Sequence, residues 1–199
     1  MNLTRAMTME RTAAAAARQD FLAACWDQLG STQREHVTSH CQAVSDLAGR
    51  LCRAMNLPAA VSARIRLAGL FHDIGKCAIP EALLAKPGPL TAIERRIVDH
   101  HAWLGGRYTL AITGDAALAE IVRRHHRPGA AARPADPAAL QASIVQVADA
   151  LVSMVSNRPY APARPKTEAL AELRRGQADQ FDPRVVQAAH RAVVWPVAA

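Results

Sequence analysis

Apolar residues at helical spacing run through almost the whole chain, and this pattern limits the fold more than any other feature of the sequence. They recur about every three to four residues, and no stretch shows the sustained alternation that a β-strand would need. Signals for helix starts support the pattern, since Pro58 can open one helix and Thr91 with Glu94 forms a capping box for another. Asp115 and Asp136 are suited to cap two more. We therefore predict an all-α domain.

The expected helices form one main domain with an additional helix before it. A chain of 199 residues fits one domain, so we assign residues 31–199 to it and residues 1–30 to an N-terminal helix. Helices are expected over residues 7–29, 31–51, 58–75, 91–101 and beyond, 115–126, 136–151, and from 182 onward. The segments 79–90 and 127–137 are rich in proline and glycine and are expected to be loops, and 158–166 is expected to join two helices rather than two domains.

The composition argues against a membrane or secreted protein. Half of the residues are hydrophobic, but no long unbroken apolar run suggests a membrane span. The alanine run at 13–17 lacks the Leu/Val-rich core of a signal peptide. The four cysteines form no CxxC pair, so a reduced, cytoplasmic protein is expected.

The charge of the chain does not by itself indicate a nucleic-acid partner. The formal net charge is +7, which would attract anions. The basic residues are nearly all arginines scattered through an alanine-rich chain, and aromatic residues make up only 4%. A nucleic-acid surface would need a basic stripe with interleaved aromatic residues, so a polymer is not an expected partner.

Histidines and aspartates occur in an order that suggests a metal site. Their positions are His36, His72, Asp73, His101, His125, His126 and Asp149. The strongest local signal is the adjacent pair His72 and Asp73, because an imidazole and a carboxylate at one helix end can bind a metal ion together, and the second carboxylate oxygen can bridge to another. Several of the others lie in apolar helical segments, where unpaired polar groups would be costly to bury. A bound cation explains the set better than core packing does.

This ordered set resembles the HD superfamily of metal-dependent phosphohydrolases, and more narrowly the HD-GYP group, which hydrolyses cyclic di-GMP. The resemblance extends over roughly residues 36–186. Beyond the histidines and aspartates it rests on LFHDIGK at 70–76, IP at 79–80, LAKPG at 84–88, LTAIE at 90–94, Gly105, VAD at 147–149, NRPY at 157–160 and FDPRVV at 181–186. It implies an HD-domain helical bundle with a di-metal site in its core.

The resemblance also implies roles for individual residues. One metal ion would be held by His36, His72, Asp73 and Asp149, and a second by His101, His125 and His126, with Asp73 bridging the two. Asp73 and Lys76 are the implied catalytic residues, and Lys76 with Arg158 would contact the phosphate of the substrate. Since imidazole dominates the second set, iron or manganese suits it better than calcium or magnesium.

The departures from the family pattern concern the substrate contacts. The Gly-Tyr-Pro signature that follows the histidine pair in the family is absent, and Arg127 stands in place of an acidic residue. Ala161 replaces a basic residue after the Arg-Pro-Tyr motif. Thr32 takes the position at which some members have a glutamate for a third metal, so a trinuclear site is not expected. The ligand set is kept, while the contacts to substrate and partner are weakened.

Two further histidines adjoin the predicted ligands without being assigned to metal. His40 lies one helical turn after His36 and is expected to be a core residue or to support a ligand. His100 precedes His101, and the family spacing to Gly105 selects His101 as the ligand. The helix before residue 31 has no counterpart in the family core, so it is either a homodimer contact or a linker from a sensor.

The sequence thus predicts a metal-dependent phosphodiesterase that hydrolyses cyclic di-GMP or a related cyclic dinucleotide. Two alternatives stay open. One is an HD phosphohydrolase that acts on another nucleotide or phosphate ester, and the other is a signalling module that binds a nucleotide or a protein partner without turnover. The missing Gly-Tyr-Pro loop motivates both.

Overall fold

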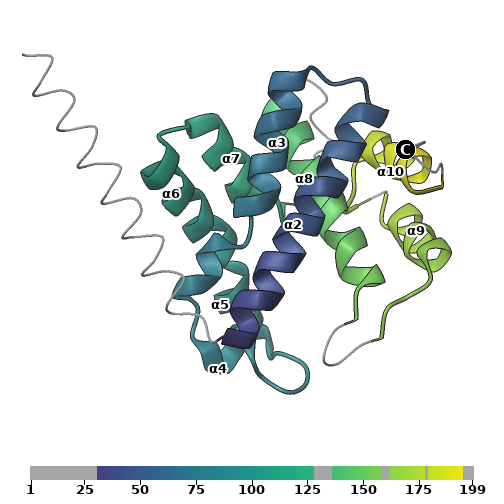
Figure 1. The fold of residues 1–199 in the computed structure, drawn as a ribbon. Helices are drawn as coiled ribbons and strands as arrows, with labels where there is room; N and C mark the ends of the chain where they lie inside the picture. The colour runs from purple at the N-terminus through teal and green to yellow at the C-terminus, as the bar shows by residue number, and fades with distance from the viewer. Residues whose placement is uncertain (1–30, 128–135, 158–161, 178, 195–199) are drawn as a thin grey trace, which may run out of the picture.

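The computed structural model describes residues 31–127, 136–157, 162–177 and 179–194, with the side chains of 31–37 and 193–194 left out. The elements are α2 Ser31–Ala54, α3 Ala59–Phe71, the 3₁₀ helix η1 Ile74–Ala78, α4 Glu81–Leu84, α5 Ala92–Asp99, α6 His101–Thr113, α7 Ala116–Arg124, α8 Pro137–Val155, α9 Lys166–Arg175 and α10 Pro183–Val194. Every element within these ranges is helical, which confirms the predicted all-α class (Figure 1). The N-terminal helix predicted for residues 7–29 lies outside the described residues, as do Arg158 and Ala161.

The predicted helix starts are confirmed by their caps. Thr91 and Glu94 form the expected capping box at the start of α5, in which each side chain bonds the backbone of the other residue. The Asp115 side chain accepts from the backbone N–H groups of Ala117 and Leu118 at the start of α7. Asp136 does the same for the start of α8. These caps satisfy N–H groups that a helix cannot bond internally, so local sequence places these starts.

Two predicted helix ends are wrong, and both lie beside the candidate metal ligands. The helix expected to run from residue 91 past His101 is two helices, because the N–H of His100 bonds to the carbonyls of both Ile97 and Val98 and ends α5. The helix expected to continue to Gly75 stops at Phe71 and is followed by η1, in which Asp73 has φ −95° and ψ 0°. These tight turns set His72, Asp73 and His101 at junctions between helices. A short helix, α4, also lies within the predicted loop 79–90.

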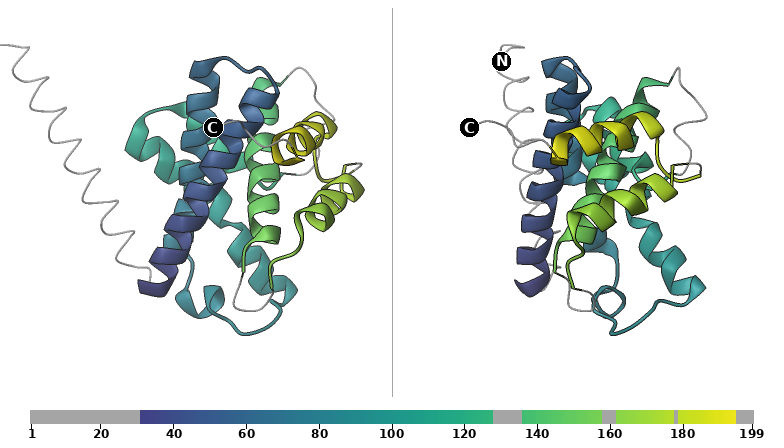
Figure 2. Two further views of the ribbon diagram at one scale, coloured as in Figure 1. Left: turned by 45° about the vertical axis from the view of Figure 1, so that its right-hand side comes forward. Right: turned by 90° about the vertical axis from the view of Figure 1, so that its right-hand side faces the viewer.

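Helix α8 is the centre of the core. It contacts α2, α3 and α7 as well as α9 and α10, so it joins the parts of the bundle that lie far apart in the sequence (Figure 2). Its length and apolar composition would also suit a membrane span, but half of its apolar window is buried by the rest of the domain. Ile144, Val145, Val147 and Ala148 are fully buried, as expected for the core helix of a bundle.

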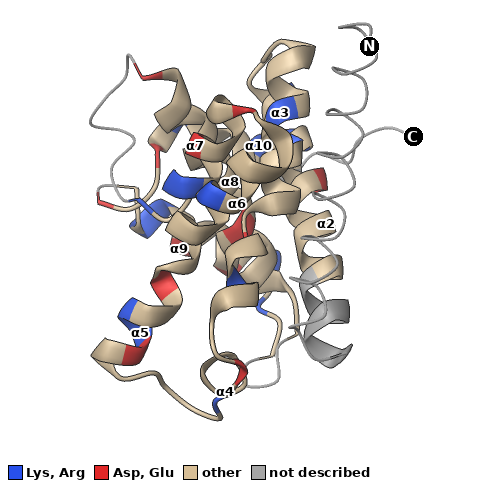
Figure 3. Cartoon of the chain, turned by 90° about the vertical axis from the view of Figure 1, so that its left-hand side faces the viewer, with Lys and Arg blue, Asp and Glu red and all other residues tan. Residues whose placement is uncertain are grey.

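The charged residues on the face that carries α5, α6 and α7 are interspersed in sign (Figure 3). Several of them pair locally, since Arg123 and Arg124 both bond Glu120, and Arg124 also bonds Asp136. Neighbouring carboxylates therefore compensate the charges of Arg123 and Arg124 on this face.

Gly75 is the point at which η1 packs against α6. A Cβ atom added there would lie 2.0 Å from the His101 carbonyl oxygen and 2.6 Å from the Gly105 nitrogen, and neither is a group that can swing away. The absence of a side chain at this position therefore lets the turn that carries Asp73 approach the start of α6.

Gly75→Ala is expected to destabilise the fold by about 3 kcal/mol, because two backbone segments would have to separate. Chemical denaturation would measure the loss, and metal content would fall with it. Gly49→Ala is the matched control, since the added Cβ would meet only the side chain of the exposed Arg66. Equal stability of the two variants would contradict this account of the η1–α6 contact.

Candidate metal centre

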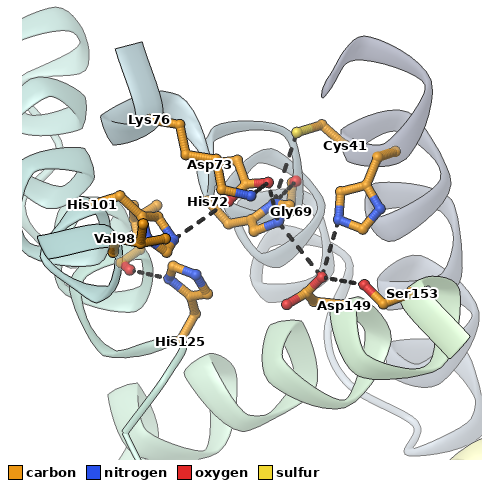
Figure 4. Close-up of polar contacts among 12 residues, drawn as sticks. Cys41, Gly69, His72, Asp73, Lys76, Val98, His101, His125, Asp149 and Ser153 are labelled. Atoms are coloured by element: carbon orange, nitrogen blue, oxygen red, sulfur yellow. Dashed lines mark hydrogen bonds and ion pairs between the residues drawn. The ribbon is translucent and has the colours of Figure 1, made fainter. Parts of the chain in front are cut away.

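The residues of the candidate centre come from segments that are well separated in the sequence. His72 and Asp73 stand between α3 and η1, and His101 is the first residue of α6. His125 follows α7 directly, and Asp149 lies in the middle of α8. Figure 4 shows these side chains pointing toward one another from their separate helices. Segments up to about half the chain apart are thus brought to one place by the tertiary fold.

The potential ligand atoms form two groups. In one, the ligand atoms of His101, His125 and His126 all lie within 4.8 Å of one another, and in the other the same holds for His40, His72 and Asp73. Asp73 lies between the groups, with Oδ2 at 3.4 Å from His72 Nε2 and Oδ1 at 3.4 Å from His101 Nε2. One carboxylate therefore presents a different oxygen to each group, which is the geometry of a bridging ligand.

Three of the histidines are oriented in the same way. The Nδ1 atom of His72 lies 2.8 Å from the Gly69 carbonyl oxygen, that of His101 lies 2.6 Å from the Val98 oxygen, and that of His125 lies 2.6 Å from the Val122 oxygen. In each case the acceptor is three residues earlier in the chain. A carbonyl can only accept, so each Nδ1 must carry the proton and each neutral ring has its lone pair on Nε2. Backbone carbonyls thus aim Nε2 into the centre, as is usual for metal-binding histidines.

Two of these Nε2 atoms are buried without a partner in the described part of the chain and are suited to bind a cation. The Nε2 atoms of His101 and His125 are buried and have no hydrogen-bond partner among the described residues. Leaving a buried polar atom unsatisfied costs about 1–3 kcal/mol. Two such atoms directed into one space lined by a carboxylate are accounted for if metal ions take their lone pairs. The residues present therefore fit a metal centre.

The pKa values of the histidines near α6 and α7 suit metal binding. Burial lowers the pKa of His101 to about 4, and it lowers the pKa of His125 well below the usual value. Burial also lowers the pKa of His126. All three are therefore neutral at neutral pH, which is the form that binds a metal ion.

Attraction between opposite charges, rather than burial, decides the pKa values of His72, Asp73 and Asp149. Burial opposes ionisation of both His72 and Asp73, but their mutual attraction outweighs it, so the pKa of His72 is raised and that of Asp73 is lowered. Burial likewise opposes the charge on Asp149, but its bond to His40 keeps the pKa of that carboxyl below its usual range. Both aspartates are therefore ionised, and metal binding at His72 would release a proton.

Lys76 stands at the edge of the centre. Its Nζ atom donates to Asp73 Oδ2 at 2.7 Å, and its side chain is partly exposed. Burial alone would lower the pKa of Lys76, but the Asp73 carboxylate raises it above its usual value. The ammonium group is therefore a permanent positive charge beside the candidate bridging carboxylate.

His40 belongs to this cluster and contacts a predicted ligand, which agrees with its expected role as a residue that supports a ligand. Its Nε2 atom lies 3.0 Å from Asp149 Oδ1, which also accepts from Ser153 Oγ at 3.2 Å and lies 3.9 Å from His72 Nε2. The side chain of His36 is outside the described residues, but its backbone is one helical turn before His40 in α2, about 6 Å along the axis. The two histidines share a face of the helix, so the sequence contained the signal but no means of choosing between them.

The structure brings together most of the predicted site. The residues that converge are His72, Asp73, Lys76, His101, His125, His126 and Asp149. Arg158 and the side chain of His36 lie outside the described residues, so their predicted roles stay predictions. His100 is exposed and stacks on Trp103 with ring centroids 4.9 Å apart, which agrees with its expected place outside the ligand set.

The fold and this centre define a helical domain built around a candidate metal site, and the comparison with known families agrees. The HD domain family matches residues 25–185, and the chain belongs to that family. The predicted membership of the HD superfamily is thereby confirmed.

Curated relatives narrow the class. The chain is 35% identical over 175 residues to the cyclic di-GMP phosphodiesterase PA4108 of Pseudomonas aeruginosa, an alignment that covers 84% of this chain and 42% of that protein. It is 34% identical over 159 residues to a cyclic di-GMP phosphodiesterase of Thermotoga maritima, covering 75% of this chain and 42% of the relative. The chain thus spans about two fifths of the length of these relatives. Their names agree with the narrower resemblance to the HD-GYP group.

Solved structures support the fold. The HD domain of the phosphodiesterase PgpH from L. monocytogenes matches with a TM-score of 0.61 at 16% identity, over 79% of this chain and 89% of that one. Bd1817, described as an HDG"Y"P protein from Bdellovibrio bacteriovorus, matches with a TM-score of 0.63 at 16% identity, over 81% of this chain and 54% of that one. At this identity the similarity concerns the fold alone.

Proposed function

We propose that this chain is a metal-dependent phosphodiesterase that hydrolyses cyclic di-GMP or a related cyclic dinucleotide. The observation that carries the proposal is Asp73, whose two oxygens face two groups of histidines as a bridge between two metal ions would require. Relatives named cyclic di-GMP phosphodiesterases and a 3'3'-cGAMP-specific phosphodiesterase support the substrate class. The PgpH HD domain, solved in complex with cyclic-di-AMP, supports it as well.

The proposed ligand sets follow the two groups. The first metal ion would be held by His40, His72, Asp73 and Asp149, and the second by Asp73, His101, His125 and His126. His36, which the family resemblance assigned to the first metal, is replaced by His40 in this proposal because His40 is the α2 histidine that bonds Asp149. Iron or manganese suits this mixture of imidazole and carboxylate better than calcium or magnesium.

Bound in this way, two divalent ions would lower the pKa of water and offset negative charge on a phosphodiester. The chain's own residues have separate tasks. Asp73 holds the two groups in register, and the carbonyls of Gly69, Val98 and Val122 fix the imidazole rings. Lys76 is proposed to face a non-bridging phosphate oxygen, and Arg158 is proposed to bind the phosphate from the segment after α8.

Hydrolysis of cyclic di-GMP by the chain, purified anaerobically and loaded with iron or manganese, tests the proposal. Chromatography would separate linear dinucleotide from GMP. Either product, absent with Asp73→Ala, would establish the activity and show that the Gly-Tyr-Pro loop is dispensable. If metal analysis finds both sites filled and no product forms, the proposed substrate is wrong.

A second candidate is favoured by the altered loop after His126. The Gly-Tyr-Pro signature is missing there, and Ala161 stands where the family has a basic residue. These changes favour a metal centre that acts on another phosphate ester, or one that binds a nucleotide without turnover. A panel of nucleotide substrates on the metal-loaded chain separates the first of these from cyclic dinucleotide hydrolysis. Calorimetry with cyclic di-GMP identifies the second, as tight binding with no product.

Two other predictions belong to this proposal. A cytoplasmic location follows from the cysteine usage, which shows no disulfide pattern. Pairing of two copies through the helix expected at residues 7–29 would explain why that helix precedes the domain. Size-exclusion chromatography with light scattering, on the full chain and on a chain that begins at residue 31, would test this pairing.

Lys76→Ala is expected to keep both metal ions and lower kcat about 100-fold, as when one preorganised donor to a developing charge is lost. Steady-state kinetics with metal analysis of the same samples would measure this. Lys166→Ala, at the exposed start of α9, is the matched control and should leave kcat unchanged. An unchanged kcat in Lys76→Ala would remove this lysine from the mechanism.

A further inference from the structure

A second candidate binding site lies between α9 and α10, on the other side of α8 from α6 and α7 (Figure 1). It is an open pocket of about 370 Å³. Its lining residues are Arg174, Gln177, Pro183, Arg184, Gln187 and His190. None of them belongs to the proposed metal centre, so the pocket is a separate feature of the domain.

The lining of the pocket is basic and rich in hydrogen-bond donors. Two arginines, two glutamine carboxamides and an imidazole surround it, and no carboxylate is among the lining residues. Pro183, Gln187 and His190 are spaced four and three residues apart, which places them along one side of α10. Arg174 reaches the same pocket from the last turn of α9. Two helices thus contribute positive charge to one space.

The charge of Arg174 is not compensated within the part of the chain that the structure describes. Its neighbour Arg175 bonds Glu172, whereas no ion pair to Arg174 is formed by the described residues. Arg184 does pair with Asp182, at 2.7 Å, but that carboxylate is 1% exposed and lies beneath the arginine rather than in the lining. Asp182 therefore offsets the charge of Arg184, and the charge that is available to a ligand is that of Arg174.

His190 adds an unsatisfied atom to the lining. Its Nε2 atom is buried and has no hydrogen-bond partner among the described residues. Burial and the charge of the nearby Arg174 lower the pKa of His190, so both residues act on the same small region. The neutral imidazole has its lone pair on Nε2, so a ligand group that donates a hydrogen bond here would satisfy it.

The backbone N–H groups at the start of α10 are not available to bind an anion in the pocket. The Arg184 N–H bonds to Asp182 Oδ1 at 2.8 Å, and the N–H groups of Val185 and Val186 bond to the Asp182 carbonyl oxygen at 3.0 Å. The N–H groups that a helix start could offer to an anion are thus already used. Recognition would depend on the side chains of the pocket.

We propose that this pocket binds a phosphate-bearing anion of up to nucleotide size. Arg174 would hold the phosphate oxygens, as guanidinium groups favour, and Arg184 would donate from Nη1, which does not bond Asp182. Gln177, Gln187 and His190 would hydrogen-bond the remainder of the ligand. The volume is at the small end of the range for small-molecule sites, about 300–1,000 Å³, which suits a mononucleotide or free phosphate.

Calorimetry on the metal-loaded full chain at an ionic strength of about 0.15 M, where the Debye length is about 8 Å, tests the site, with GMP and inorganic phosphate as probes. Arg174→Glu is expected to weaken binding at this site at least about tenfold, since it replaces a charge-assisted contact by repulsion. Arg175→Glu changes the net charge equally one position away, outside the lining, and should alter the affinity by less than about twofold. Equal weakening by the two substitutions would overturn the proposal.

The Asp73→Ala variant distinguishes binding at this pocket from binding at the metal centre. Binding that persists in this variant and is lost with Arg174→Glu belongs to the pocket, whether or not the chain hydrolyses cyclic di-GMP. Gln187→Glu, which leaves the metal centre untouched, should weaken the same binding. The pocket is not an anion site if the Asp73→Ala variant, which retains Arg174 and Gln187, binds neither probe. Tighter binding of GMP than of phosphate indicates a nucleotide ligand, and equal affinity indicates free phosphate.

Discussion

Asp73→Ala is expected to lose both metal ions and to reduce phosphodiesterase activity below detection. The carboxylate is 4% exposed, and its two oxygens lie 3.4 Å from the Nε2 atoms of His72 and His101. Removing it takes one ligand from each proposed metal ion, and it also leaves the Lys76 ammonium group without its 2.7 Å partner. An unpaired ammonium group that is only partly exposed is costly, so metal affinity and local order should fall together.

Metal analysis by mass spectrometry and hydrolysis of cyclic di-GMP would measure the two effects. Asp46→Ala is a suitable control, because this aspartate is exposed on α2 and forms only a 3.5 Å pair with Arg66. Circular dichroism would show that Asp73→Ala still folds. Two full metal equivalents in the folded Asp73→Ala variant would show that Asp73 is not a bridge.

The second large effect is expected on α2, where His40→Ala should lose one metal equivalent and lower activity more than about 100-fold. His40 bonds Asp149 at 3.0 Å, and its ligand atom lies with those of His72 and Asp73. Truncating it would open one ligand position and leave the ionised Asp149 without this partner. The second metal ion, held by His101, His125 and His126 in our proposal, should remain.

His36→Ala is the matched control for this prediction. It removes the same side chain one turn earlier on the same helix, and it is expected to leave metal content unchanged. The reverse result, with metal lost in His36→Ala and kept in His40→Ala, would restore the assignment implied by the family pattern. Loss of metal in both variants would mean that the two histidines act together.

The helices could be predicted from the sequence because their starts depend on short-range bonds. The capping residues Thr91, Asp115 and Asp136 each bond backbone N–H groups within three residues, so local sequence is enough to place them. The ends at Phe71 and Asp99 could not be predicted in this way. They depend on how η1 packs against α6, which involves Gly75 and Gly105 from separate segments.

The residues of the candidate centre could be predicted because their types and order are distinctive. His72 and Asp73 are neighbours in the chain, and so are His125 and His126. The carbonyls that orient these rings could not be foreseen. They are the oxygens of Gly69, Val98 and Val122, which face the rings only because the helices end or turn there.

By itself, the sequence determined the all-α fold, the helix starts and most of the residues that converge at the metal centre, because periodicity, caps and residue types are local properties. Only the tertiary structure placed His40 against Asp149, since two histidines four residues apart share a helix face and the choice depends on where α8 crosses α2. The same holds for the basic pocket, whose arginines stand on separate helices and meet only because α9 and α10 pack together.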